Sequence, residues 1–311
     1  MVTEHNRAGG EVGSQPGRMG EMDGWLTTRV IDWFAEAGRD LPWRAAGTTA
    51  WGVLVSEVMA QQTPVARVAP VWREWMERWP TPKDFAHASQ ADVLRAWGRL
   101  GYPRRALRLH ECAAAVVELH DGEVPADVEK LRALPGVGVY TAAAVAVFHY
   151  RRRHPVVDTN VRRVIARYCT GESDSGMATS AADLRAAAAI LPEHAETAAQ
   201  HSVALMELGA LVCTARKPSC GECPVSERCR FKAAGAVVPD GPSRKPQRYH
   251  GTTRYVRGRI MALLRDSSEP VPRVTVDGVW HEAARREAAL NGLIADGLVE
   301  ALPGDRFGLP T

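Results

Sequence analysis

Apolar residues recur along most of the chain at the spacing of an α-helix. In the first such run Leu26, Val30, Trp33 and Ala37 lie three or four positions apart, so they share one helical face. The same periodicity predicts further helices over residues 91–97, 106–119, 161–168 and 203–211. Alternation of apolar and polar residues, the pattern of a half-buried strand, is scarce. The main body is therefore predicted to be all-α.

Helix-breaking residues divide this body and separate it from a C-terminal part. Pro, Gly and Ser gather at residues 41–42, 79–82, 122–125 and 171–175. Residues 235–247 are rich in Gly, Pro and basic side chains, which is typical of a linker. Two more helices are predicted over 257–265 and 282–295, the second closed by Gly297. With a hairpin predicted over 298–309, they indicate a small winged-helix-like module.

Composition and charge say little about the class of this protein. The chain has 311 residues, a formal net charge of +3 and a pI near 8.6, which gives weak support for a polyanionic partner. No apolar run reaches the roughly 20 residues that span a bilayer. Residues 1–22 are rich in Gly and Glu and lack the hydrophobic stretch of a secretion signal. We therefore predict a disordered tail over 1–22 and a cytoplasmic protein with no membrane partner, associated with the nucleoid if bacterial.

Four cysteines are packed into one short segment. Cys213, Cys220, Cys223 and Cys229 follow the pattern Cys-x6-Cys-x2-Cys-x5-Cys. Thiols this close together either pair with one another or converge on a metal centre. Structural zinc usually uses two Cys-x2-Cys pairs, whereas this segment has one, and no secretion signal favours disulfides. The spacing therefore favours a [4Fe-4S] cluster over zinc, and zinc over disulfides.

A Pro-Gly-x-Gly turn separates two predicted helices. Leu134-Pro135-Gly136-Val137-Gly138 lies between helical runs at 128–133 and 141–147. The two glycines allow a tight turn that presents backbone N–H groups, with the positive end of the following helix, to a phosphate oxygen. Further along the chain, Asp158 stands immediately before a predicted helix, which its carboxylate is expected to cap. The sequence thus predicts a phosphate-contacting hairpin followed by a positioned carboxylate.

In this combination the chain resembles the helix-hairpin-helix (HhH-GPD) DNA glycosylase superfamily, and in particular the branch that removes adenine mispaired with oxidised guanine. The resemblance covers residues 25–230 and rests on further motifs in the expected order. These are Leu41-Pro42-Trp43-Arg44, then Trp51 through Ser56-Glu57-Val58-Met59-Ala60-Gln61-Gln62-Thr63, then Gly98-Arg99-Leu100-Gly101-Tyr102.

The resemblance implies an architecture of two helical lobes and a monomer that binds duplex DNA containing a mispair. A six-helix barrel with the hairpin is expected over residues 42–154. Residues 23–41 and 155–232 are expected to form the lobe that holds the cluster. A linker over 233–253 and the winged-helix-like module over 254–311 complete the predicted chain.

Two carboxylates are candidates for the chemistry. On the helix predicted over 51–62, Glu57 shares a face with Gln61 and lies beside Val58 and Met59. Desolvation there favours the protonated carboxyl, which suits a general acid. Asp158, at a helix N-terminus, is expected to stay ionised. Cleavage of a glycosidic bond needs such a pair, one group to protonate the leaving base and one to stabilise an oxocarbenium-like sugar.

The resemblance gives these groups definite roles. It implies that Glu57 protonates the departing purine at N7 and later helps to activate water, while Asp158 steadies the cationic sugar. Some relatives carry a lysine at the position of Tyr140 and use its amine to form a Schiff base and nick the strand. Tyrosine cannot form that imine, so a monofunctional glycosylase that leaves an abasic site is predicted. Asn160 and Arg44 are expected to support the pocket, Arg44 by hydrogen bonding to the extruded base.

A base can leave the duplex only if other groups fill its place. By resemblance, Tyr102 wedges beside the base opposite the lesion, and Gln61 and Gln62 fill the vacated space or contact the partner strand. Arg216 and Lys217, between the first two cluster cysteines, are expected to meet the DNA backbone because the cluster would hold their loop in place. The residues predicted to contact DNA are Gln61, Gln62, Leu100, Tyr102, Gly136, Val137, Gly138, Arg216 and Lys217.

Three functions are compatible with the sequence. The first is an adenine glycosylase of base excision repair, and the motif from Glu57 to Gln62 favours it. The second removes thymine or uracil opposite guanine, because tyrosine also occurs at the position of Tyr140 in some thymine-mismatch relatives. The third is a noncatalytic iron-sulfur DNA-binding regulator, which would not need Glu57 and Asp158 together. Residues 249–311 do not match the large C-terminal domain that reads oxidised guanine in many adenine glycosylases, so the preference among opposite bases stays open.

Overall fold

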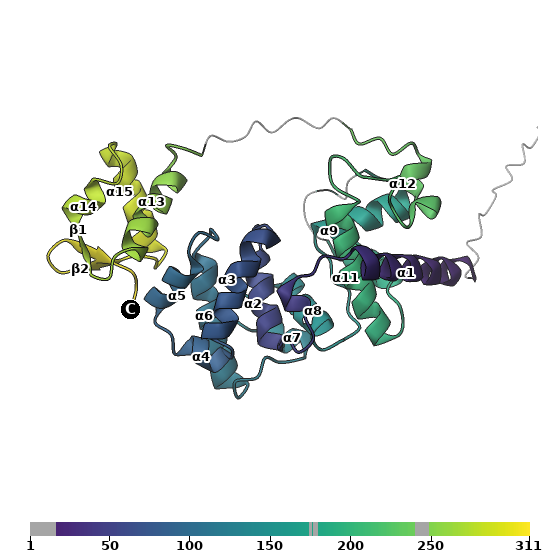
Figure 1. Cartoon of the computed structure of the whole chain (residues 1–311), viewed down its shortest axis with the longest axis horizontal. Coiled ribbons are helices and arrows are strands. Elements are labelled where there is room, and N and C mark those ends of the chain that lie inside the picture. Colours follow the sequence, from purple (N-terminus) through teal and green to yellow (C-terminus); the bar gives the residue numbers. More distant parts are fainter. Residues whose placement is uncertain (1–16, 174–175, 177–179, 240–248) are drawn as a thin grey trace, which may run out of the picture. The chain divides into compact units, whose positions relative to one another are not determined.

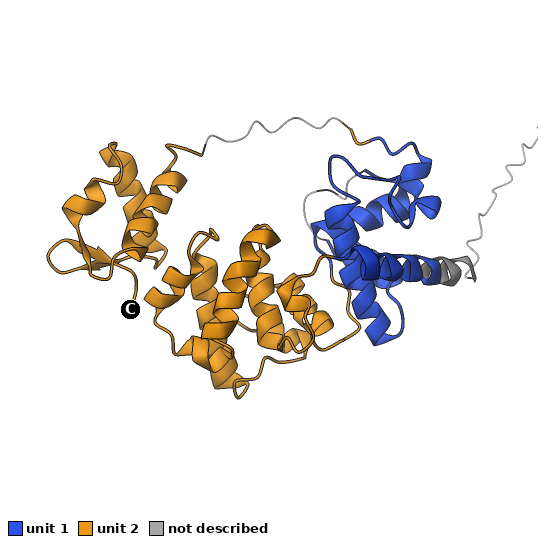
Figure 2. Cartoon of the chain, viewed as in Figure 1, with its two compact units in different colours: residues 1–38, 157–237 blue, residues 39–156, 238–311 orange. Residues whose placement is uncertain are grey.

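The computed structural model describes residues 17–173, 176, 180–239 and 249–311, and these fall into two compact units. Unit 1 combines Met1–Gly38 with Val157–Val237, and unit 2 combines Arg39–Val156 with Val238–Thr311 (Figure 2). The predicted tail over 1–22 lies outside the described residues as far as residue 16. Helix α1 (Gly17–Ala37) begins within it, so residues 17–22 are helical and not part of a disordered tail. The described chain is mostly helical, which confirms the predicted fold class.

Unit 2 begins with a short 3-10 turn, followed by seven helices that are labelled in Figure 1. The helices contribute buried residues to a core that contains Trp75, whose ring lies 5.0 Å from that of Phe85 and 5.6 Å from that of Trp97. Several helices begin at side-chain caps, among them Thr81, which forms a reciprocal capping box with Asp84. The elements are η1 (Pro42–Arg44), α2 (Ala50–Ala60), α3 (Val65–Arg78), α4 (Pro82–Ala86), α5 (Gln90–Trp97), α6 (Arg104–Leu119), α7 (Val128–Arg132) and α8 (Val139–Phe148).

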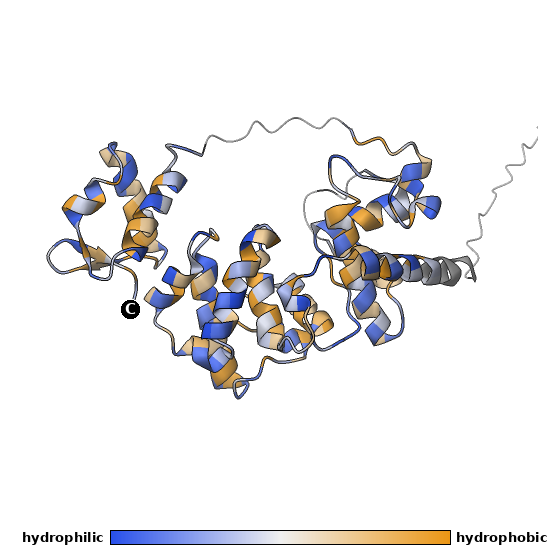
Figure 3. Cartoon of the chain, in the orientation of Figure 1, coloured by the Kyte–Doolittle hydropathy of each residue, from blue (hydrophilic) through white to orange (hydrophobic). Residues whose placement is uncertain are grey.

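The helices follow the apolar periodicity of the sequence. In α6 the buried positions Ala106, Leu109, Cys112, Ala113 and Val116 repeat every three or four residues, as expected of one helical face. Figure 3 shows the resulting alternation of apolar and polar colour around the ribbons. Helix α2 is different because nearly all of its residues are buried, so it runs through the core of this unit. No helix in the described part of the chain combines the length and the apolar content needed to cross a bilayer.

Helix α2 is shorter than the sequence predicted. It ends at Ala60, so Gln61 is the C-cap and Gln62 has a positive φ of 55°. The cause is Pro64, which disfavours helical geometry at the preceding residue, Thr63, so the helix ends before it. Gln61 and Gln62 therefore belong to a turn, and Gln61 does not extend the helical face of Glu57.

Unit 1 is a second helical body around its own core. Helix α1 packs against α11, and α11 packs against α9, so that Leu26, Val164 and Leu208 meet in the interior. The helix predicted over 161–168 is in fact α9 followed by a π-helical turn that Gly171 ends with a φ of 85°. The remaining elements are α9 (Thr159–Ile165), η2 (Ala166–Thr170), α10 (Ala181–Ala189), α11 (Ala195–Leu211), η3 (Ser226–Arg228) and α12 (Arg230–Ala233).

The C-terminal part of unit 2 has the order of elements of a winged helix. Its two longer helices and the β2–β3 hairpin were predicted, whereas β1 and α14 were not, because two to five residues carry too little periodicity. The three short strands form an antiparallel sheet in the order β1-β3-β2. The elements are α13 (Thr253–Arg265), β1 (Val271–Pro272), α14 (Arg273–Asp277), α15 (Ala283–Ala295), β2 (Glu300–Leu302) and β3 (Arg306–Gly308).

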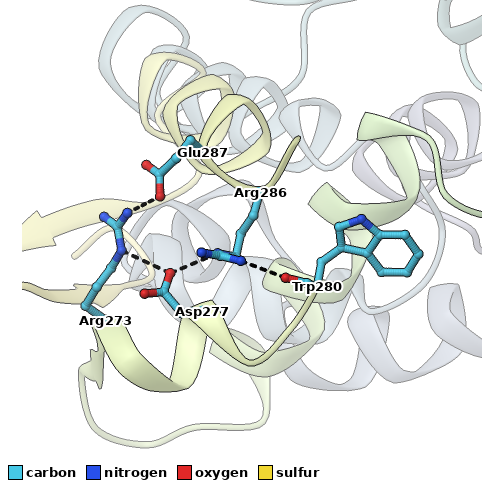
Figure 4. A network of polar contacts seen from close by, with 5 residues as sticks. All are labelled: Arg273, Asp277, Trp280, Arg286 and Glu287. Atoms are coloured by element: carbon cyan, nitrogen blue, oxygen red, sulfur yellow. Dashed lines mark hydrogen bonds and ion pairs between the residues drawn. The ribbon is translucent and has the colours of Figure 1, made fainter. Parts of the chain in front are cut away.

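Ion pairs fix the helices of this module to one another (Figure 4). Asp277 accepts from Arg273 at 3.2 Å and from Arg286 at 2.8 Å, and Arg273 also pairs with Glu287. Arg286 donates to the carbonyl of Trp280 at 2.7 Å. The first turns of α15 are thus tied to α14, and these arginines are engaged inside the module.

Candidate active site, DNA-contacting elements and cluster loop

Asp158 occupies the N-cap of α9, as predicted. Its Oδ1 accepts from the backbone N–H of Val161 at 2.7 Å, and its Oδ2 accepts from Nδ2 of Asn160 at 2.8 Å. Burial raises the pKa of Asp158, while these hydrogen bonds and the charge of Arg163 oppose the rise. The direction is opposite to the one that a helix N-terminus alone predicts, because desolvation outweighs the helix end. The structure thus holds a desolvated carboxylate in one orientation.

A chain of hydrogen bonds runs from Asp158 to the cysteine loop. Nη2 of Arg163 donates to Oδ1 of Asn160 at 2.8 Å, which fixes the amide that donates to Asp158. Nε of the same arginine donates to the carbonyl of Cys213 at 2.7 Å. Arg163 was not recognised in the sequence, because its partner Cys213 lies fifty positions away in the chain.

Gly209 allows this chain to form. Helix α11 passes so close to the start of α9 that a Cβ on Gly209 would lie 2.7 Å from the Cβ of Asn160. The carbonyl of Gly209 also accepts from Nη2 of Arg163 at 2.7 Å. A residue without a side chain is therefore required beside Asn160.

Glu57 and Tyr140 lie on two packed helices of unit 2. Glu57 is half-buried on α2 between the buried residues Ser56 and Val58, and α2 packs against α8. Tyr140, also half-buried, lies in the first turn of α8 directly after the hairpin. This position carries a phenol and not an amine.

The hairpin is a tight turn that exposes the start of α8. The N–H of Val137 donates to the carbonyl of Leu134 at 3.2 Å, and Gly136 has a φ of 74°, so Pro135 and Gly136 form a type II turn. The first intrahelical bond of α8 runs from Ala142 to the carbonyl of Gly138, which leaves the N–H groups of the first turn directed outward. Gly136 and Gly138 are exposed, whereas Val137 is buried and anchors the turn. Such a helix start is suited to a phosphate oxygen.

The two hairpin glycines are expected to respond differently to substitution. At Gly136 an alanine would have a strained φ, and its Cβ would lie 3.0 Å from the Cβ of Arg108. We expect Gly136→Ala to lower the free energy of unfolding by about 1–2 kcal/mol, measured by urea titration.

Gly138 instead faces open space with an ordinary φ of −90°. An aspartate there caps α8 well but places a negative charge where a phosphate would lie. We expect Gly138→Asp to keep the stability of the protein and to weaken duplex binding about tenfold or more, and less so at high salt. Gly138→Ser, which caps without a charge, is the matched control. Equal affinity of the aspartate and serine variants would mean that no phosphate lies at this turn.

Arg105 holds the loop of Tyr102 against the end of α2. One guanidinium nitrogen donates to the carbonyls of Val58, Met59 and Gln61, at 2.8, 3.1 and 2.6 Å. The other donates to Oγ1 of Thr63 and to the carbonyl of Gly101, both at 3.0 Å. Burial lowers the pKa of Arg105 to about 10. The donors of both terminal guanidinium nitrogens are therefore engaged within the protein and are not directed toward a phosphate.

The predicted wedge residues differ in exposure. Tyr102 is 47% exposed with a φ of 47°, and Gln62 is exposed, whereas Leu100 is only 5% exposed and packs in the core. Because the side chain of Leu100 is buried in the core, it is not exposed for the predicted contact with DNA. Tyr102 lines a cavity of about 380 Å³. Its other lining residues include Gln61, Arg104, Arg105, Arg108 and Gly136.

This cavity joins the Tyr102 loop, the turn after α2 and the hairpin into one basic groove. The side chains of Arg104 and Arg108 are more than half exposed beside it. A groove with exposed arginines next to outward N–H groups matches the charge of a DNA backbone. Arg44 is placed elsewhere in the unit, where Nη1 donates to the carbonyl of Arg39 at 3.1 Å.

The four cysteines of unit 1 surround one cavity. All are free thiols, and the cavity is completed by apolar residues such as Val212 and Phe231 together with Arg167. Burial, reinforced by the neighbouring cysteines, raises the pKa of Cys223 to about 11, so the thiolates need positive charge to form. A [4Fe-4S] cluster bound by these four cysteines supplies that charge.

Arg167 connects the cluster loop to the end of α9. It is 1% exposed, and its donors reach the carbonyls of Thr214 at 2.7 Å and Ala215 at 2.9 Å, with Sγ of Cys213 at 3.4 Å. Directly after these carbonyls, Arg216 and Lys217 are exposed on the loop. The predicted basic pair is therefore carried by a loop that a buried arginine fixes. Only the position of Arg167, one helical turn after Arg163, could have indicated this role from the sequence.

Comparisons with known proteins agree with this arrangement. Residues 55–189 match the model of the HhH-GPD superfamily of base excision DNA repair proteins, and residues 213–229 match the iron-sulfur binding domain of endonuclease III. The chain is 54% identical over 284 residues to the adenine DNA glycosylase of Mycobacterium tuberculosis, covering 91% of this chain and 93% of the relative. A Homo sapiens adenine DNA glycosylase is 41% identical over 211 residues. That match covers 65% of this chain and 38% of the human protein.

Solved structures show the same fold. A thermostable thymine-DNA glycosylase aligns with a TM-score of 0.63 and 25% identity, covering 69% of this chain and 98% of that chain. A trapped endonuclease III–DNA covalent intermediate aligns with a TM-score of 0.59 and 23% identity, covering 70% of this chain and 98% of that chain.

The helix-hairpin-helix body, the capped aspartate and the iron-sulfur loop define a DNA N-glycosylase of base excision repair. The chain belongs to the HhH-GPD superfamily and, within it, to the adenine DNA glycosylase family.

Proposed function

We propose that this protein removes adenine mispaired with 8-oxoguanine or guanine from duplex DNA by hydrolysis of the N-glycosidic bond. The observation that carries the proposal is the 54% identity with adenine DNA glycosylases over nearly the whole of both chains. A match of 284 of the 311 residues must span the hairpin, the positions of both candidate carboxylates and at least part of the C-terminal module.

The chemistry of the proposal rests on groups of this chain. Glu57 gives a proton to the departing adenine, and Asp158 stabilises the positive charge that develops on the sugar as the bond breaks. The hydrogen bonds of Asp158 to Val161 and Asn160 keep its carboxylate in one orientation, so it needs no reorganisation when the charge appears. The two residues belong to different units, Glu57 to unit 2 and Asp158 to unit 1.

The product is proposed to be an abasic site on an intact strand. Tyr140 occupies the first turn of α8, where an amine would be needed to form a Schiff base with the sugar. Water, activated by Glu57 after the base has left, then takes the place of the adenine. The hairpin, the basic groove and the loop with Arg216 and Lys217 hold the backbone meanwhile.

Removal of thymine or uracil opposite guanine is a second candidate. The observation that favours it is the structural match to a thymine-DNA glycosylase with a TM-score of 0.63. At 25% identity this match is far weaker than that with the adenine glycosylases.

Base release from labelled duplexes separates the two candidates. The duplexes carry adenine opposite 8-oxoguanine, adenine opposite guanine, thymine opposite guanine or uracil opposite guanine, and an adenine–thymine duplex is the control. We expect release of adenine from the first two only, with no strand break until alkali is added. Release of only thymine or uracil would instead establish the second candidate. We also propose that the protein acts as a monomer in the cytoplasm, associated with the nucleoid if bacterial.

A further inference from the structure

Tyr102 has a backbone conformation that other contacts must maintain. Its φ of 47° lies in the left-handed region, which costs energy for a residue with a bulky side chain. It stands between Gly101, with a φ of 86°, and Pro103. Almost half of the side chain is exposed, so burial in the core does not hold it. Such a conformation persists only where the surroundings determine it.

One support comes from the barrel, the body of unit 2 formed by helices α2–α8. The guanidinium carbon of Arg105 lies 5.8 Å from the centre of the Tyr102 ring, and the same side chain donates to the carbonyl of Gly101 at 3.0 Å. Arg105 therefore fixes the backbone of the loop just before Tyr102 and lies beside its ring.

The second support comes from the C-terminal module. The guanidinium carbon of Arg254, in the first turn of α13, lies 4.9 Å from the centre of the Tyr102 ring. The exposed ring of Tyr249 also contacts this side chain, with its centre 5.9 Å from the same guanidinium carbon. The Tyr102 ring thus interacts with one cation from the barrel and one from the module, both within the range of a cation–π contact.

The module is attached to the barrel at both ends of the Tyr102 loop. Before the loop, Arg95 of α5 donates to the carbonyl of Ser267 at 3.3 Å. After the loop, Arg104 pairs at 3.2 Å with Asp296, which also pairs with Arg257 of α13. The loop is therefore bounded by two attachments that bring Arg254 to its ring.

We propose that the C-terminal module is a positioning element for Tyr102, and that Arg254 is the residue that holds the ring in place. The loop would then be ordered before it meets the duplex and would need no further ordering on binding. The inference rests on the proposed function for its consequence in catalysis, but the ordering of the loop is a property of the protein alone. The module would thus act by positioning Tyr102 and would not itself contact a base.

The ordering is tested without substrate, by amide hydrogen exchange in the full-length protein. We expect the amides of residues 99–102 to exchange faster in Arg254→Met than in wild type. Arg254→Lys, which keeps a cation, should restore most of the protection. Arg259→Met removes an exposed arginine of the same helix and should leave these amides unchanged. Unchanged exchange in Arg254→Met would overturn the proposal.

Kinetics then separate positioning from a direct phosphate contact. If Arg254 acts through Tyr102, Arg254→Met should slow adenine release about two- to fivefold, keep the salt dependence of duplex binding and have no further effect in a Tyr102→Ala background. A fall in the salt slope by about one, with equal loss of affinity for all duplexes, would show a phosphate contact and overturn the proposal. If wild type releases no adenine, the proposed function fails, while the exchange experiment still decides whether the module orders the loop.

Discussion

Replacement of Glu57 by glutamine is expected to reduce adenine release by about 10²- to 10⁴-fold while the protein stays folded and binds the mispair as wild type does. Glutamine keeps the size and the polarity of the side chain, so the packing of α2 between its buried neighbours is preserved. It cannot give up a proton, however, and adenine is a poor leaving group without one. The loss should therefore appear in the single-turnover rate and not in the dissociation constant.

The matched control is Glu74→Gln, which makes the same change on the exposed face of α3 in the same unit. It should leave both the rate and the affinity unchanged. Release by Glu57→Gln within about tenfold of wild type would mean that another group protonates the base.

A modified substrate tests the role of the proton itself. Adenine methylated at N7 already carries a positive charge in its ring and needs no proton at that atom to leave. The difference between wild type and Glu57→Gln should therefore shrink to less than about tenfold on such a duplex. A defect as large as with unmodified adenine would assign Glu57 to a different step, such as activation of water.

The parts of the site that the sequence predicted correctly are those set by neighbours in the chain. A carboxylate directly before a helix caps that helix, and Asp158 does so through Val161, three positions on. The hairpin turn likewise depends on Pro135 and Gly136 alone. The four cysteines fall within seventeen residues, so their convergence followed from their spacing.

The sequence could not show contacts between side chains and distant backbone. Arg105 stands directly after a loop that was predicted to contact DNA, yet its partners are carbonyls and one hydroxyl of the protein, up to 47 positions away. The burial of Leu100 depends in the same way on helices packed from elsewhere. The early end of α2 is a different case, because Pro64 is close enough to have indicated it. Arg163 makes one contact of each kind: its partner Asn160 is close in the sequence, whereas its partner Cys213 is fifty positions away.

Loss of Arg163 is expected to reduce adenine release by about 10- to 100-fold, the usual cost of removing a group that orients a reacting side chain or ligand. Arg163→Met breaks the hydrogen bonds to Asn160 and to the carbonyl of Cys213 at once. Asn160 then loses the partner that orients its donor toward Asp158. Arg163→Lys keeps the charge without the two directed donors, so it should recover only part of the rate. Arg185→Met, an exposed arginine of α10, is the control.

The dependence of this loss on pH identifies Asp158 as the group affected. Burial already raises the pKa of Asp158, while the charge of Arg163 and the hydrogen bond from Asn160 hold it down. Removing Arg163 weakens both of these effects, so the pKa of Asp158 should rise further. Because the reaction needs the ionised carboxylate, activity is lost as the pH falls through this pKa, and the acid limb of the rate profile should move to higher pH in Arg163→Met. An unmoved limb with a uniformly lower rate would show that Arg163 acts on the cluster loop and not on Asp158.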